Sequence, residues 1–430
     1  MGSSQRMKNV ARLICDGQKK IVVISAMSGT TNTLIDIAAC FFRKDRTGAE
    51  EMLSKHEQKY LLEIGQLFVT GEYREKASAD VAACFRHIRT FSEVPFTPFD
   101  EKEVVAQGEL MSSCMMNHYL QECGVKSVLL PALEFMRTTV DAEPDLDYIR
   151  EKLQGLLEQH GDADLYITQG FICRNAFGQV DNLKRGGSDY TASLIGAALD
   201  AEEIQIWTDI DGMHNNDPRF VNETSPVRQL NFEEAAKLAY FGAKILHPTC
   251  ILPAKTHNIP VRLLNTLQPD AAGTLISNTA EKGKIKAVAA KDGITYVKIK
   301  SARSLQLHKF LSRVFDTFAK FQTPVDMVTT SEIGVSVTID NPEHLPEIVR
   351  ELEPYAAVTV EKDMVIICVV GDLEWQNIGF EASIINALKD IPMRMISYGG
   401  SNSNVSLVMK ASDKKQALQA LSESLFRNKA

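Results

Sequence analysis

A loop of small and charged residues is the strongest chemical signal in this chain of 430 residues. The stretch VDNLKRGGSDYTASLIGAAL (180–199) leads from Arg185 through two glycines into an apolar helical pattern. Glycines let backbone N–H groups approach an anion closely, and a helix start adds a favourable dipole. Arg185 supplies a planar fork for a carboxylate or phosphate. Asp189 is either a helix cap or a catalytic carboxylate, and a capped turn with a solvated arginine explains the pattern equally well.

A second polar loop, WTDIDGMHNNDPR (207–219), follows a strand pattern that begins at residue 203. Ligands of parallel α/β sheets bind beyond the carboxyl ends of the strands, so this loop is placed for a nucleotide. The spacing of its acidic residues fits no EF-hand loop, and a plain acidic surface loop is the competing interpretation. The candidate side chains are Thr208, Asp209, Asp211, Asp217 and Arg219.

Two weaker signals lie in the first quarter of the chain. AMSGTTN (26–32) follows a strand pattern at 21–25 and offers backbone N–H groups and the hydroxyl of Thr31 to an anion. Such residues also simply mark loops. In FDEKEVVAQGELMSS (99–113), Glu109 follows Gly108, where a ligand or backbone could pass close. For an isolated helical glutamate, however, a solvated position is the commoner explanation.

A lysine stands at a predicted helix junction in FGAKILHPTC (241–250). Lys244 either faces solvent or reaches a phosphate as a point charge. His247 precedes a proline near a helix start, and we interpret it as structural.

Composition limits the partners of the protein. The formal net charge of −8 argues against a general affinity for nucleic acid or anionic membranes. The eight cysteines form no C-x-x-C pair, which is typical of reduced thiols in a cytosolic protein rather than of a metal site. No apolar run has the length of a membrane span, and no signal-peptide layout is present. We therefore predict a cytoplasmic protein whose partners are small molecules or proteins.

Strand-like and helical patterns alternate up to about residue 280. This alternation predicts an α/β fold with a largely parallel sheet between layers of helices. The strand patterns cover 19–25, 127–131, 163–171, 203–209 and 259–265. The helical patterns cover 33–43, 103–122, 189–200, 231–241 and 246–257, after an opening helix capped by Ser3 or Ser4.

The last third of the chain contains an internal repeat of βαββαβ units, the order of a small ferredoxin-like domain. The second unit lacks its last strand, whereas IKAVAAK (285–291) is a strand pattern without a partner. We predict that this orphan strand completes the second unit, which would interweave the two small domains. The predicted domains are therefore 1–280, 294–363, and 364–430 together with 285–291.

Taken together, these stretches resemble the aspartate kinases of the amino-acid kinase family. SAMSGTTN, QGELMSS, LKRGGSDYTA, WTDIDGMHNNDPR and GAKILHP occur in the family's order, and the repeat resembles tandem ACT domains. The resemblance implies an amino-acid kinase sheet followed by two interwoven ACT domains. It also implies ATP-dependent phosphorylation of the side chain of L-aspartate to 4-phospho-L-aspartate, the first step toward lysine, threonine, methionine and isoleucine.

The resemblance also implies roles for the candidate residues. Arg185 would hold the α-carboxylate of aspartate, and Asp189 would organise the transferring centre. The other residues around the amino acid would be Thr31, Glu109, Gly186, Gly187 and Ser188. ATP, with Mg²⁺ bridging its phosphates, would contact Thr208, Asp209, His214, Asp217, Arg219 and Lys244. A carboxylate nucleophile is already ionised at neutral pH, so phosphoryl transfer needs positioning and charge neutralisation rather than a strong base.

A regulatory site is implied in TPVDMVTTSEIGVSVTID (323–340). Its residues Val325, Asp326, Ser331 and Glu332 match positions that contact the effector at a dimer interface in lysine-sensitive relatives. Two carboxylates suit a cationic amino acid, so we predict L-lysine as effector and a homodimer or tetramer formed through the ACT domains. A ferredoxin-like core with polar turns is the alternative.

Two departures from the family pattern bear on activity. His214 stands where the family often has Tyr. The family's first strand ends in K-F-G-G-T-S, a motif that this sequence does not contain, and MGSSQRMKNVARLI matches the segment that follows it. We therefore expect the chain as given to be impaired as a kinase. A mis-assigned start site explains the missing strand better than an evolved loss, because the downstream ligand positions are retained, and a catalytically inactive amino-acid sensor is the alternative function.

Overall fold

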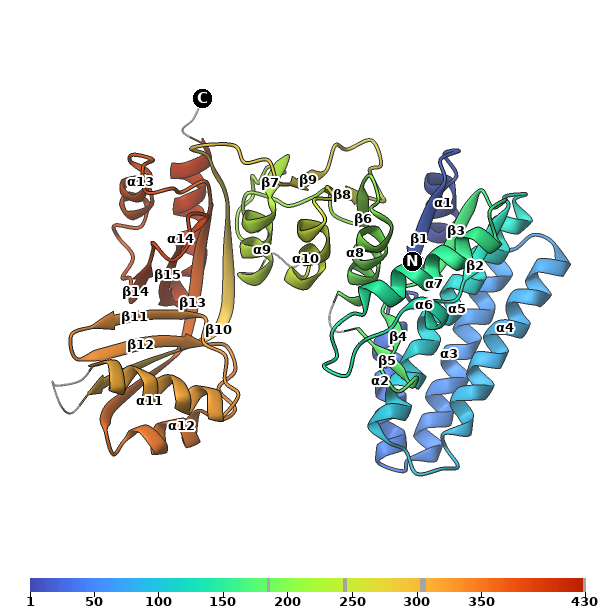
Figure 1. The fold of residues 1–430 in the computed structure, drawn as a ribbon, viewed down its shortest axis with the longest axis horizontal. Helices are drawn as coiled ribbons and strands as arrows, with labels where there is room; N and C mark the ends of the chain where they lie inside the picture. Colours follow the sequence, from blue (N-terminus) through green and yellow to red (C-terminus); the bar gives the residue numbers. More distant parts are fainter. Residues whose placement is uncertain (184–185, 243–245, 302–306, 428–430) are drawn as a thin grey trace. The chain divides into compact units, whose positions relative to one another are not determined.

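A computed structural model describes residues 1–183, 186–242, 246–301 and 307–427 (Figure 1). The chain divides into two compact units. One comprises Met1–Ile210 and Thr249–Ala271, and the other comprises Asp211–Pro248 and Ala272–Ala430. The domain limits expected from the sequence divide the chain differently and stay a prediction.

The sheet of the first unit is parallel, as predicted. Its three strands run in the order β1-β3-β2, with Ile24 opposite Gln169 and Leu130 opposite Thr168. Every residue of the central strand is buried, as expected for a parallel strand covered on both faces. The strands are β1 (Lys20–Ile24), β2 (Ser127–Leu130) and β3 (Leu165–Gln169), and a second parallel pair is β6 (Ile204–Thr208) with β8 (Val261–Asn265). A short antiparallel hairpin joins β4 (Ile172–Arg174) to β5 (Val180–Asn182).

Helices cover both faces of this sheet, because successive side chains of β3 point to opposite sides. Leu165 and Ile167 pack in a core with α1–α5, whereas Tyr166 packs in a second core with α7 and α8. A capping box between Thr97 and Asp100 starts the long α5. The helices are α1 (Ser4–Ile14), α2 (Thr30–Phe42), α3 (Arg46–Leu67), α4 (Gly71–Thr90), α5 (Pro98–Glu122), α6 (Ala132–Phe135), α7 (Leu146–Gln159), α8 (Gly187–Leu199) and α10 (Pro248–Thr256).

The two ferredoxin-like units share one antiparallel sheet of six strands, in the order β11-β12-β10-β13-β15-β14 (Figure 1). The orphan strand predicted at 285–291 and the first strand of the first ferredoxin-like unit form one long strand, β10 (Ile285–Ser301). Likewise, the last strand of the first ferredoxin-like unit and the first strand of the second form one strand, β13 (Ala356–Gly371). The two long strands pair along their length, so that 285–291 lies beside the first strand of the second ferredoxin-like unit. The predicted interweaving is confirmed.

The second of the two compact units, which contains the whole six-stranded sheet, buries two cores, one under each half of that sheet. A capping box between Asn231 and Glu234 starts α9 (Phe232–Tyr240). Its other elements are β7 (Gln229–Asn231), β9 (Thr274–Ser277), α11 (Leu307–Lys320), β11 (Met327–Ser331), β12 (Gly334–Ile339), α12 (Leu345–Leu352), α13 (Phe380–Ala387), β14 (Met395–Ser397), β15 (Asn404–Lys410), η1 (Ala411–Asp413), α14 (Lys414–Ser422) and η2 (Glu423–Arg427). In the part of the chain that is described, no helix is both long and apolar enough to span a membrane.

Candidate active site

A buried carboxyl group lies where α5 passes the loop that follows β1. Glu109 is 3% exposed, and its Oε1 accepts a hydrogen bond from the backbone N–H of Ala26 at 3.3 Å. Its Oε2 has no partner within the described chain. Burial disfavours the charged form and raises the pKa of Glu109 to about 7. Glu109 is therefore a buried acceptor with one oxygen available to a ligand, and not a solvated helical residue.

The preceding glycine allows this approach. A Cβ atom at Gly108 would lie 3.0 Å from the Cβ of Ala26 and 3.1 Å from the Cγ2 of Thr30. Thr30 is fully buried, and its hydroxyl lies 3.0 Å from the hydroxyl of Tyr60 on α3. Sequence reasoning selected the half-buried neighbour, Thr31, and missed Thr30 and Tyr60. Their sequence signal is weak: a hydroxyl at the start of α2 and a tyrosine on the buried face of the amphipathic α3.

The glycine loop starts α8, as the sequence suggested. Gly186 caps the helix with φ of 74°, in the left-handed region that favours glycine. A Cβ at Gly187 would lie 2.4 Å from the ring of Phe171, so this glycine serves packing against the turn after β3. Thr191 fastens the same turn, since its Oγ1 accepts a hydrogen bond from the N–H of Phe171 at 3.0 Å. The loop is thus held at the carboxyl end of the central strand.

Asp189 lies in the first turn of α8, and Ser188 is half-buried beside it. Burial raises the pKa of Asp189 to about 6. A Cβ atom at Gly170 would overlap the side chain of Ser188, so the loop and the end of β3 are in close contact. Arg185 lies outside the described residues.

A cavity of about 260 Å³ opens at the carboxyl ends of β1, β6 and β8. Thr208 and Asp209 line it, together with Trp207, Arg6 and Ala26. The hydroxyl of Thr208 accepts a hydrogen bond from the N–H of Ile210 at 3.1 Å, which shapes the turn after β6. The cavity is therefore lined by two predicted nucleotide residues, Thr208 and Asp209, and by Ala26, which donates to Glu109. It lies at the edge of the sheet where ligands bind in this fold class.

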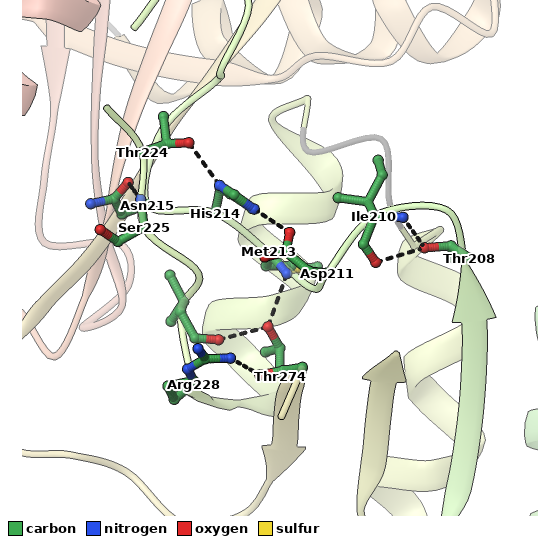
Figure 2. A network of polar contacts seen from close by, with 12 residues as sticks. Thr208, Ile210, Asp211, Met213, His214, Asn215, Thr224, Ser225, Arg228 and Thr274 are labelled. Carbon is green, nitrogen blue, oxygen red and sulfur yellow. Dashed lines mark hydrogen bonds and ion pairs between the residues drawn. The ribbon is translucent and has the colours of Figure 1, made fainter. Parts of the chain in front are cut away.

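The other predicted nucleotide residues belong to the second unit. Figure 2 shows His214 between two partners: its Nε2 lies 2.6 Å from Oδ1 of Asp211, and its Nδ1 lies 2.7 Å from Oγ1 of Thr224. Arg219 donates from Nε and Nη2 to Asp217, at 2.9 and 2.6 Å. Burial alone would raise the pKa of Asp217, but the arginine lowers it. His214, Asp217 and Arg219 are thus engaged within their own loop, and Lys244 lies outside the described residues.

The predicted effector residues lie around β11. Val325 is half-buried, whereas Ser331 and Glu332 are exposed at the far end of the strand. The Asp326 side chain is 1% exposed and pairs with Lys291, whose Nζ lies 2.6 Å from Oδ1. Sequence reasoning missed Lys291, because only the pairing of distant strands brings it to Asp326. Within the described residues, no group of three His, Cys, Asp or Glu side chains could hold a metal ion.

Comparison with known proteins agrees with this architecture. Residues 1–265 match the amino acid kinase family, and residues 367–425 match an ACT domain. The match to the kinase family spans more than half of the chain. The chain therefore belongs to the amino acid kinase family and carries ACT regulatory domains.

The relatives narrow this class. Lysine-sensitive aspartokinase 3 of Escherichia coli K12 is 30% identical over 426 residues, which cover 96% of this chain and 94% of that protein. The chloroplastic aspartokinase 1 of Arabidopsis thaliana is 31% identical over 450 residues, covering 100% of this chain and 79% of the relative. Within its family the chain is thus an aspartokinase, that is, an aspartate kinase.

Solved structures of an aspartokinase are similar to this chain over nearly its whole length. The structure of E. coli aspartokinase III in complex with aspartate and ADP (R-state) has a TM-score of 0.83 at 30% identity, covering 99% of this chain and 98% of that one. The complex of the same enzyme with lysine and aspartate (T-state) has a TM-score of 0.78 at 31% identity, covering 98% and 96%. The fold class expected from the sequence is confirmed.

Proposed function

We propose that this aspartokinase transfers the γ-phosphoryl group of ATP to the side-chain carboxylate of L-aspartate. The products are 4-phospho-L-aspartate and ADP, and the reaction opens the synthesis of lysine, threonine, methionine and isoleucine. The observation that carries the proposal is the buried Glu109, whose unpartnered Oε2 lies beside the loop that lines the cavity of Thr208 and Asp209. The relative solved with aspartate and ADP supports the same pair of ligands.

Both charged groups on the α-carbon of aspartate meet an opposite charge in this proposal. Oε2 of Glu109 accepts a hydrogen bond from the substrate ammonium group, with Thr31 at the same end. Arg185 binds the α-carboxylate, beside Gly186, Gly187 and Ser188. One oxygen of the side-chain carboxylate attacks the γ-phosphorus in line, and the bond from phosphorus to the bridging oxygen of ADP breaks. No proton moves in this step, so the reaction requires no histidine or cysteine as a base.

Asp189 orients the transferring group, while Thr208, Asp209, His214, Asp217, Arg219 and Lys244 bind the nucleotide. Mg²⁺ prefers carboxylate and phosphate oxygens, and Asp209 beside the cavity and Asp189 at the helix start are ligands of that kind. The ion supplies neutralisation of the charge that spreads over the phosphate oxygens.

Feedback by L-lysine is the regulatory part of the proposal. Val325, Asp326, Ser331 and Glu332 form the effector site, at an interface of a homodimer or tetramer built through the ACT domains. The buried carboxylate of Asp326 and the exposed one of Glu332 suit a cationic amino acid. The E. coli relative is named lysine-sensitive and was solved with lysine.

A coupled assay of ADP release tests the reaction, with L-aspartate or L-glutamate as acceptor and with or without L-lysine. We expect release that depends on aspartate and falls when lysine is added. Arg185→Ala should raise the KM for aspartate at least tenfold or abolish turnover, since it removes the counter-charge of the α-carboxylate. Arg86→Ala on the exposed side of α4 is the matched control and should change neither constant. Unchanged aspartate kinetics in Arg185→Ala would refute the assignment.

A further inference from the structure

A buried carboxylate in the ACT sheet is held from one side only. Oδ1 of Asp326 accepts a hydrogen bond from the hydroxyl of Tyr240 at 2.5 Å and pairs with Nζ of Lys291 at 2.6 Å. Oδ2 of the same carboxylate has no partner among the described residues, although the side chain is only 1% exposed. An unsatisfied buried acceptor costs free energy, which a ligand that donates a hydrogen bond would recover.

The charge around this carboxylate is unbalanced. Lys291 also pairs with Oδ2 of Asp340, at 2.9 Å. Burial alone would lower the pKa of Lys291, but its hydrogen bonds with Asp326 and Asp340 raise it, so the ammonium stays charged. Two carboxylates and one ammonium leave one negative charge, which complements the ammonium group of an effector amino acid.

The contacts of Asp326 come from different parts of the second unit. Tyr240 is the last residue of α9, in the kinase part of the sequence, whereas Lys291 lies on β10 and Asp326 directly precedes β11. The ammonium of Lys291 also lies 4.3 Å from the centre of the Tyr240 ring. Burial and the neighbouring Asp326 raise the pKa of the Tyr240 hydroxyl to about 12, so it remains a donor at neutral pH. Asp326 therefore links α9 to the ACT sheet through polar contacts, and we call the set Tyr240, Lys291 and Asp326 the joint.

The end of α9 has a second attachment of a different kind. Gly242 has φ of 112°, and a Cβ atom there would lie 2.2 Å from the carbonyl oxygen of Ala290 on β10. This backbone packing cannot be competed for by a small ligand. A ligand can compete for the hydrogen bond of Tyr240, however, because its acceptor, Asp326, also belongs to the proposed effector site.

We propose that Asp326 is shared between the effector and α9, and that this sharing transmits feedback. When the effector ammonium binds Oδ2, it draws the carboxylate away from Tyr240 and Lys291 and loosens the end of α9. From there the chain continues into GAKILHP, the motif that carries Lys244. A ligand shifts an equilibrium only through different contacts in the two states, and the hydrogen bond of Tyr240 is that difference. This inference rests on the proposed feedback by lysine.

Tyr240→Phe tests the joint, because it removes the hydroxyl and keeps the ring. We expect kcat and KM without lysine to stay within twofold, and lysine binding measured by calorimetry to stay within about threefold. Maximal inhibition by lysine should fall to less than half of its wild-type extent. Tyr296→Phe is the matched control, since the hydroxyl of this buried tyrosine lies 2.8 Å from Ser336 in the same sheet, whereas the described hydrogen bonds of the Asp326 side chain come from Tyr240 and Lys291. It should leave inhibition unchanged.

The outcomes separate this inference from the proposed function. If the wild-type protein neither binds lysine nor is inhibited by it, the proposed regulation fails, and the joint fails with it. If the wild type does both and Tyr240→Phe is inhibited as fully, only the joint is overturned. Asp326→Asn should instead weaken lysine binding itself by tenfold or more, because a neutral amide loses the charge that attracts the ammonium. Unchanged binding in Asp326→Asn would also overturn the inference.

Discussion

The backbone N–H of Ala26 donates a hydrogen bond to Oε1 of Glu109 across 3.3 Å, and thereby joins the loop after β1 to the middle of α5. The same residue, Ala26, lines the cavity that Thr208 and Asp209 border. Glu109 therefore contacts a residue, Ala26, that lines the cavity proposed for the nucleotide. This geometry makes Glu109 the most informative residue to titrate.

Aspartate binding should depend on the ionisation of Glu109. Its pKa is raised to about 7, so the carboxylate that would accept the substrate ammonium forms only as the pH rises through that value. The KM for aspartate should therefore fall between pH 6 and pH 8. Glu109→Gln should raise KM and flatten this profile, which initial-rate measurements across the range would show. An identical profile in wild type and variant would contradict the role.

The free energy of unfolding should also depend on the ionisation of Glu109, but it should decrease as the pH rises, whereas aspartate binding should improve. Because the folded pKa of about 7 exceeds the ordinary value of 4.5, the native state binds more protons within this window. The free energy of unfolding therefore falls as the pH rises from 4.5 to about 7. Glu109→Gln removes the buried charge and should raise the free energy of unfolding at pH 8 by on the order of 1–3 kcal/mol, and at pH 4 by little. Urea denaturation at both pH values measures this difference.

Gly108 should tolerate no side chain. A Cβ atom there meets Ala26 and Thr30 at 3.0 and 3.1 Å, so Gly108→Ala pushes α5 away from α2. We expect a loss of about 1–3 kcal/mol in the free energy of unfolding and a raised KM for aspartate, since Glu109 moves with the helix. Gly65→Ala is the matched control: it lies in α3 with no atom within 4 Å of its Cβ position, and should stabilise by roughly 0.5–1 kcal/mol. Equal effects of the two substitutions would contradict this account of Gly108.

How much the sequence predicted depended on how local the signal was. The strand after residue 19 and the helix that follows the glycine loop are contiguous patterns, and the structure contains both as β1 and α8. The α4 helix was missed although Val81, Phe85 and Ile88 follow helical spacing, a signal that was available. The α3 helix is harder to detect, because two of its buried side chains, His56 and Tyr60, are polar.

The pairing of 285–291 with a distant strand was predictable from the repeat, but side-chain contacts between distant segments were not. Lys291 meets Asp326 because β10 and β11 both flank β12 in a fixed register, a relationship of three strands that no local pattern encodes. The raised pKa of Glu109 likewise depends on how completely α2 and α5 exclude water. Motifs could therefore name the candidate residues but not their partners or their protonation.

Asp189 should act in its ionised form. Burial raises its pKa to about 6, so kcat should increase as the pH rises through 6 and level off above it. Asp189→Asn keeps the shape but not the charge and should lower kcat by roughly 10²–10³-fold, the cost of removing one preorganised electrostatic group. The KM for aspartate should change much less. A variant with wild-type kcat at pH 8 would exclude this role.

Hydrogen exchange should report the shared ACT sheet directly. The amides of 285–291 lie in β10 and pair with β13 through contacts such as Val288 opposite Val369. Amides in a central strand exchange only on large-scale opening, whereas exposed loops exchange at once. Segment 285–291 should thus be protected to within about tenfold of 364–370, while the loop 374–378, where Ile378 is fully exposed, serves as the fast reference. If 285–291 exchanged with that loop, the strand would be a linker, and the two ACT units would fold as separate domains and not as one interwoven sheet.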